Sequence, residues 1–148
     1  MTTTSHALGP LVAVYGLVGH DGRLLVVGDL DTATHRLPGG LVRAGEAVED
    51  SLRRIVREQV DTQVANLDFS GVVELRAHRA GTQPTVFELA LLFDVTLADP
   101  STVRAGHGET RWVTDTELGQ LDLRPTPLAD RLRLGGLTSE HPWWPARS

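Results

Sequence analysis

LPGGLVRAGEAVEDSLRRIVREQVDT, residues 37–62, is the most informative stretch of the chain. Two adjacent glycines after a proline permit backbone angles that other residues avoid, which predicts a loop. Acids at Glu49 and Asp50 suit the first turn of a helix, where the dipole favours negative charge. An amphipathic helix is predicted from about Ala47 to Val60, because apolar residues recur there at the spacing of one helix face. These residues are Val48, Leu52, Ile55, Val56 and Val60.

Runs of apolar and β-branched residues flank this loop and helix. Residues 11–18 (LVAVYGLV) predict a strand buried on both faces, and an Asp-Gly turn leads to a returning strand at 23–27. Further along, the pattern predicts loops at 28–36 and 98–108, strands at 69–79, 85–96 and 109–113, a short helix from Thr114-Asp115 to Gly119, and a helix at 127–134. The order of these elements predicts one α/β domain.

Composition limits the classes of function. The 148 residues include no cysteine, which excludes disulfides and thiolate metal sites, and the net charge is −5. All 14 basic residues are arginines, scattered along an acidic chain, so general nucleic-acid binding is not expected. No apolar run approaches the ~20 residues that cross a bilayer, and residues 1–10 lack the apolar core of a signal peptide. We therefore expect a cytoplasmic protein that does not bind a membrane.

The stretch at 37–62 resembles the Nudix box, G-x5-E-x7-R-E-U-x-E-E-x-G-U, in which U is a bulky aliphatic residue. The matches at the correct spacing are Gly40, Glu46, Arg54, Val56 and Glu58. Arg-Trp-Val at 111–113, followed by Glu-Leu at 117–118, also resembles the family's usual close. The resemblance covers roughly residues 11–134 and implies a Nudix-like α/β/α sandwich with a mixed β-sheet. Residues 1–10 would then form a flexible leader and 135–148 a C-terminal tail.

The chain departs from the box at positions that matter for chemistry. Ile55 stands where the family has the glutamate after the arginine, and Gln59 replaces the second acid of the pair. Asp61 replaces the glycine that usually ends the helix, and His35 stands where members often have an aromatic residue. Ile55 is most simply an additional core residue, because it continues the apolar face of the helix.

These departures affect the chemistry that the resemblance implies. Nudix enzymes cleave a nucleoside diphosphate linked to another group, and Mg²⁺ or Mn²⁺ neutralises the diphosphate while water attacks phosphorus. Positions 55, 58 and 59 project to one side of a helix, and only Glu58 keeps its carboxylate. A neutral amide and an aliphatic side chain attract a divalent ion poorly. We therefore expect weak or lost hydrolysis, with Mg²⁺ or Mn²⁺ as cofactor if the protein is active and possibly no cofactor otherwise.

The resemblance also assigns site residues. Glu58, Gln59 and the backbone of Gly40 would form a weak metal site, and Glu58 with Glu109 would act in catalysis if activity survives. Gly39, Gly40 and Arg43 would lie near the substrate, although Gly39 and Gly40 could form only a tight turn and Arg43 could be solvated. Glu46 and Arg54 are expected to form a structural ion pair. His107 is a further candidate base, and Tyr15, Phe87 and Trp112 are expected in the core.

Three functions stay open. The first is a divergent Nudix domain that binds a nucleotide-like phosphorylated ligand with weak or lost hydrolysis. The second is an active hydrolase with a rearranged metal site, and the third is a scaffold for protein interactions. Trp143-Trp144 in the tail is expected to dock on the body or on a partner, because two exposed aromatic rings are costly. A homodimer stays an alternative to a monomer, and no substrate can be named.

Overall fold

The computed structural model describes residues 9–29, 32–77, 86–104, 106, 108–133 and 141–146. Its elements, in chain order, are β1 (Leu11–His20), β2 (Arg23–Asp29), β3 (Thr34–Arg36), β4 (Gly39–Leu41), α1 (Val48–Val60), β5 (Val64–Ala77), β6 (Val86–Leu97), the 3-10 turn η1 (Pro100–Thr102), β7 (Glu109–Val113), α2 (Asp115–Leu118), β8 (Leu123–Arg124), α3 (Thr126–Arg133) and β9 (Trp143–Trp144).

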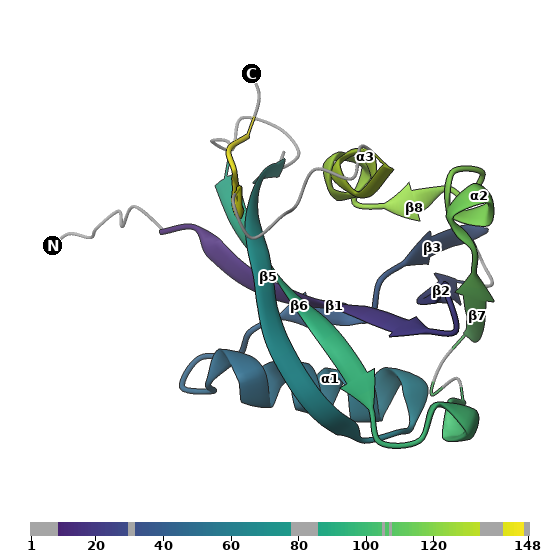
Figure 1. The fold of residues 1–148 in the computed structure, drawn as a ribbon. Coiled ribbons are helices and arrows are strands. Elements are labelled where there is room, and N and C mark those ends of the chain that lie inside the picture. Colours follow the sequence, from purple (N-terminus) through teal and green to yellow (C-terminus); the bar gives the residue numbers. More distant parts are fainter. Residues whose placement is uncertain are drawn as a thin grey trace, which may run out of the picture.

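The strands form a mixed sheet in the order β8-β3-β2-β1-β6-β5-β9, with β4 paired to β1 and β7 paired to β2. The central pair β1–β6 is parallel, whereas β5–β6 and β1–β4 are antiparallel. Helix α1 lies on one side of the sheet and α3 on the other (Figure 1). The predicted α/β/α sandwich with a mixed sheet is confirmed.

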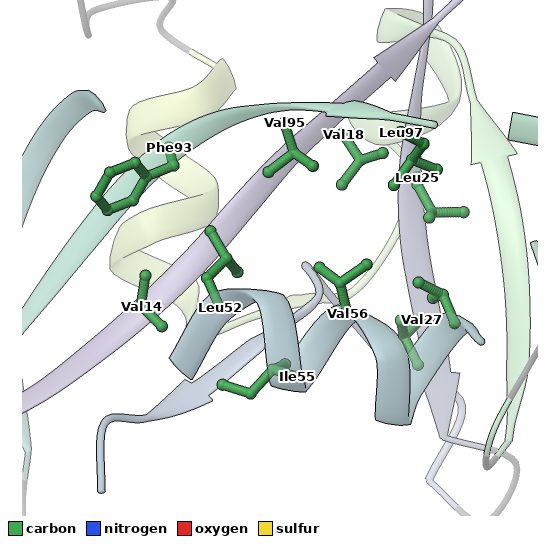
Figure 2. Packing of buried hydrophobic residues seen from close by; sticks show 11 residues of the cluster. Val14, Val18, Leu25, Val27, Leu52, Ile55, Val56, Phe93, Val95 and Leu97 are labelled. Carbon is green, nitrogen blue, oxygen red and sulfur yellow. The ribbon is translucent and has the colours of Figure 1, made fainter. Parts of the chain in front are cut away.

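Two apolar cores fill the space between these layers. The first joins α1 to the sheet through Leu52 and Val56, which Figure 2 shows pointing from the helix toward the strands. The second lies beneath α2 and α3 and includes Leu128. The alternating side chains of β1 serve both cores, since Val14 belongs to the first and Tyr15 packs against the second. This confirms the expected strand with two buried faces.

The three aromatic residues expected in the core have different environments. Tyr15 packs against the second core and Trp112 against the first, as expected. Phe87 is instead 36% exposed, so the expectation is wrong for this residue. It lies near the start of β6, where the guanidinium of Arg76 stacks over its ring and takes the place of a core contact.

Several short strands lie where the sequence predicts no strand. β3 lies within the expected loop at 28–36. The predicted loop at 98–108 also contains a short regular element, the 3-10 turn η1. β5 begins at Val64, five residues before the expected strand, and crosses a bulge between Phe69 and Gly71. Polar three-residue strands and bulged strands lack the regular alternation on which such a prediction depends.

The helix at Thr114 has the predicted cap, because the Thr114 hydroxyl accepts the N–H of Glu117.

The tail docks on the body of the same chain. β9 pairs in parallel with β5, and the Arg131 guanidinium lies 4.0 Å from the centre of the Trp144 ring. Trp143 stays half-exposed, at 52%. The strand thus docks on the body, with the Trp144 ring packed against it and the Trp143 ring half-exposed. Most of the expected leader, residues 1–8, lies outside the described part of the chain. Within that part, no helix has the length and apolar character to span a membrane.

Candidate functional site

The glycine loop of the box runs along the central strand. Gly39 and Gly40 of β4 face Tyr15 and Val14 of β1. The N–H of Gly16 bonds the carbonyl of Pro38, and the alternation of an antiparallel ladder then turns the N–H and C=O of Gly39 away from β1. A Cβ at Gly39 would lie 2.5 Å from the Val14 carbonyl. Glycine is therefore required at position 39 for close approach to β1.

Gln59 satisfies the backbone groups that Gly39 turns away from the sheet. Its Nε2 donates to the Gly39 carbonyl at 3.0 Å, and its Oε1 accepts the Gly39 N–H at 3.2 Å. The same Oε1 also accepts Arg36 Nη1 at 3.0 Å. The amide oxygen assigned to a weak metal site thus already has two donors. Gln59 joins the end of α1 to the loop and to β3.

Ile55 lies in the core cluster, at 4% exposure. Figure 2 shows it on a different side of α1 from Leu52 and Val56. Its Cδ1 would lie 3.7 Å from a Cβ built on Gly40, so it packs beside the glycine loop. The sequence expectation of an additional core residue is confirmed, and this position presents an apolar group to the loop.

Glu46 and Arg54 form a two-pronged ion pair at the start of α1. Arg54 Nε and Nη2 each lie 3.0 Å from a carboxylate oxygen of Glu46, and the Ser51 hydroxyl donates to the same carboxylate at 2.5 Å. Hydrogen bonds from Arg54 and then Ser51 lower the pKa of Glu46 to about 2. Arg54 Nη1 also reaches Glu58 Oε2 at 3.2 Å, and Glu58 remains 53% exposed. One arginine thus joins both retained box acids.

Glu109 is joined to β3. Its Oε1 lies 3.3 Å from Nε2 of His35, a buried residue whose Nδ1 has no hydrogen-bond partner. Arg43 is exposed and close enough to Glu46 to help lower the pKa of that carboxyl. His107 lies outside the described residues. Among those that are described, no three Asp, Glu or His side chains gather where they could hold a metal ion.

A pocket of about 350 Å³ lies on the opposite side of β1 from α1. Tyr15 projects toward it, and burial first and then the charge of Glu88 raise the pKa of Tyr15 to about 12. Burial also raises the pKa of Glu88. The lining is mainly apolar but contains three arginines; it comprises Tyr15, Arg36, Leu75, Arg76, Glu88, Arg124, Pro125 and Pro127.

Sequence reasoning missed most of this pocket. Its residues come from five separate segments of the chain, and they meet only because the sheet order β8-β3-β2-β1-β6-β5 brings these segments together. Arg36 comes directly before Leu37 at the start of the box stretch, and this closeness in sequence was a signal that it lies beside the glycine loop. Arg124 gave no signal, because β8 is two residues long and was not predicted.

The box residues do not fit the metal site that the family pattern implies. Position 55 is aliphatic and buried, and the oxygen of Gln59 is bonded to Arg36 and Gly39. Glu58 alone presents a carboxylate, and it is paired with Arg54. Hard divalent cations require several oxygen ligands, mainly carboxylates. The chemistry available here is that of a guanidinium-lined, largely apolar pocket beside a braced glycine loop.

A mixed sheet between helices, with a glycine loop and a box helix against its central strand, defines a domain with the Nudix architecture. A model of the NUDIX domain matches residues 7–132, and the chain belongs to the Nudix family. That family generally works with a divalent metal ion.

Curated relatives include the nucleoside triphosphatase NudI of Escherichia fergusonii, 31% identical over 93 residues. That match covers 59% of this chain and 66% of the relative, just under two thirds of its length. The NudI of Escherichia coli O139:H28 is 28% identical over 107 residues, which is 68% of this chain and 75% of the relative.

Solved structures share the fold at lower identity. A NUDIX hydrolase from Nitrosomonas europaea has a TM-score of 0.71 at 18% identity, with 98% of this chain and 83% of that chain covered. A MutT protein from Methanosarcina mazei has a TM-score of 0.67 at 21% identity, with 85% and 92% covered.

Proposed function

We propose that this Nudix domain binds a nucleotide-like phosphorylated ligand and has weak or lost metal-dependent pyrophosphohydrolase activity. One observation most directly supports the weak or lost activity. Gln59 bonds the backbone of Gly39 and the guanidinium of Arg36, and so is not available as a metal ligand. Ile55 supplies no ligand, so Glu58 is the last acid among box positions 55, 58 and 59.

The pocket supports the first half of the proposal. At about 350 Å³ it falls within the range of ~300–1,000 Å³ typical of small-molecule sites. Its apolar walls suit a flat ring, and Tyr15 offers an aromatic face with a hydroxyl that stays protonated at neutral pH. Arginine guanidinium groups match phosphate oxygens in geometry and charge. An apolar pocket with guanidinium groups is therefore suited to a molecule that has both a ring and a phosphate.

The test combines turnover with binding. Nucleoside triphosphates, dinucleotides and nucleoside-diphosphate sugars are incubated with the protein in Mg²⁺ or Mn²⁺, and the E. coli NudI relative is assayed in parallel. We expect turnover at least about 100-fold below that of the relative, since even outer-shell changes at metal sites cost ~10–100-fold. Calorimetry with the same compounds should still detect binding. Turnover at the rate of the relative would contradict the proposal.

An active hydrolase with a rearranged metal site is the second candidate. Two observations favour it: the curated relatives are named nucleoside triphosphatases, and Glu58 remains exposed. If it is correct, Glu58→Ala should abolish turnover, while Glu49→Ala, at an exposed acid in the first turn of the same helix, should not. Equal residual turnover in the two variants would exclude a role for Glu58.

A further inference from the structure

Arg36 is a cation that contacts the end of the box helix and also lines the pocket. It belongs to β3, and its Nη1 donates to Gln59 Oε1 at 3.0 Å. It also lines the pocket, together with Tyr15 and Arg124. Arg36 and Glu88 change the pKa of Tyr15 in opposite directions, so both charges lie close to that ring. Arg36 therefore connects the altered box position to the space where a ligand would lie.

The partners of Gln59 determine the orientation of its amide. The amide nitrogen is required at the Gly39 carbonyl, and the amide oxygen is required at the Gly39 N–H and at Arg36. A glutamate at this position would place a carboxylate oxygen 3.0 Å from the Gly39 carbonyl, with no proton between them. It would also pair with Arg36 and neutralise its charge. Glutamine holds the guanidinium in place and leaves that charge unpaired.

The three pocket arginines differ in the partners of their guanidinium groups. Arg124 bonds the carboxylate of Asp122 through Nε and Nη2. Arg76 stacks over the Phe87 ring at 5.2 Å. Within the described ranges, the Arg36 side chain has no carboxylate partner and no hydrogen bond besides the one to Gln59. A half-buried guanidinium with free N–H donors forms strong charge-assisted bonds to an anion.

We propose that Arg36, positioned by Gln59, binds a phosphate group of the ligand directly, so that binding in this pocket needs no divalent cation. The inference rests on the proposed function, because it specifies how the phosphorylated ligand is held. The fixed guanidinium supplies the positive charge that a metal ion would otherwise bring. Pyrophosphate and phosphate esters are the class of ligand that this arrangement recognises.

The experiment titrates inorganic pyrophosphate into the full chain by calorimetry, once in EDTA and once in Mg²⁺. We expect binding in EDTA, with equal or weaker binding in Mg²⁺ because the ion neutralises the probe. Arg36→Ala should weaken binding in EDTA by about 10-fold or more, the worth of a charge-assisted hydrogen bond. Arg57→Ala is the matched control, because it removes an equal charge from an exposed site on the last turn of α1.

Gln59→Glu is the second variant and leaves Arg36 in the chain. It should also weaken pyrophosphate binding in EDTA, since the new carboxylate pairs with the guanidinium. Thermal unfolding verifies that each variant is folded. The metal dependence of the unmodified protein is decisive even if a variant does not fold.

Three outcomes would overturn the inference. Binding that appears only with Mg²⁺ would refute the role of Arg36 and leave a phosphorylated ligand possible. Equal affinities of Arg36→Ala and Arg57→Ala would also refute that role. Failure to bind pyrophosphate or any nucleotide, with or without Mg²⁺, would remove both the inference and the proposed function.

Discussion

Helix α1 has two sides that differ in how far they keep the family pattern. On one side, Arg54 and Glu58 match the box and form a continuous ion-paired group with Glu46 of the preceding loop. On the other, Ile55 and Gln59 depart from it and contact the glycine loop through apolar packing and amide hydrogen bonds. The brace between loop and helix can evidently persist without the acids that bind metal. In this domain, the two altered box positions hold the glycine loop against α1.

Ile55→Glu is the most severe test of the altered side. The carboxylate would replace a side chain at 4% exposure within the core cluster. We expect a loss of about 3 kcal/mol in the free energy of unfolding, as for other uncompensated buried charges. Chemical denaturation measures it, with Ile55→Val as a control that should lose only about 1 kcal/mol. An Ile55→Glu variant that stays stable and binds Mg²⁺ would show that the family's metal geometry is still accessible.

Gln59→Leu removes the hydrogen bonds that Gln59 makes with Gly39 and Arg36, and it keeps a side chain of similar size. The buried N–H and C=O of Gly39 would lose their partner. We expect destabilisation of about 2 kcal/mol, since each unsatisfied buried group costs ~1–3 kcal/mol and water can enter at the pocket. Denaturation and amide hydrogen exchange at Gly39 report it. Unchanged exchange protection at Gly39 would show that Gln59 does not hold the loop.

Glu46→Gln tests the retained side through pH. The folded pKa of Glu46 is lowered from 4.5 to about 2, so the unfolded chain binds the extra proton between these values. Its contribution to stability is complete above about pH 4.5 and disappears as the pH falls toward 2. The variant should therefore be less stable than the parent at pH 6 and converge with it near pH 2. Denaturation at a series of pH values measures the gap, and a gap independent of pH would refute the ion pair as its source.

Asp61→Gly tests the C-terminal end of α1, where Asp61 is the capping residue. Asp61 adopts a left-handed conformation, with φ 51° and ψ 43°, at the position where the family has glycine. Glycine removes the steric cost of that conformation but loses more entropy on folding, so we expect a gain of about 0.5 kcal/mol. Thermal unfolding measures it, with Asp50→Gly in the first turn as a destabilising control. A loss of stability at position 61 would mean that the Asp61 side chain makes a contribution of its own.

The sequence allowed prediction of elements whose pattern is local. The helical face from Val48 to Val60, the two-faced strand at β1 and the cap at Thr114 all follow from nearby residues. It did not allow prediction of β3 and β8, because they are three and two residues long and too short to show an alternating pattern. β8 also pairs with a strand that is distant in the chain. The Ile55 and Gln59 departures were visible, but the partner of Gln59 was not. Arg36 became important only when β3 brought it beside the end of α1.

The docking of β9 provides an optical reporter. Two of the three tryptophans of the chain, Trp143 and Trp144, belong to this two-residue strand. Intrinsic fluorescence therefore comes mostly from the C-terminal end, and it should change when the strand leaves β5 and the indole of Trp144 separates from Arg131. Circular dichroism instead follows the helices and the remaining sheet. Recording both signals during one melt would resolve peeling of the chain end from collapse of the domain without any added label.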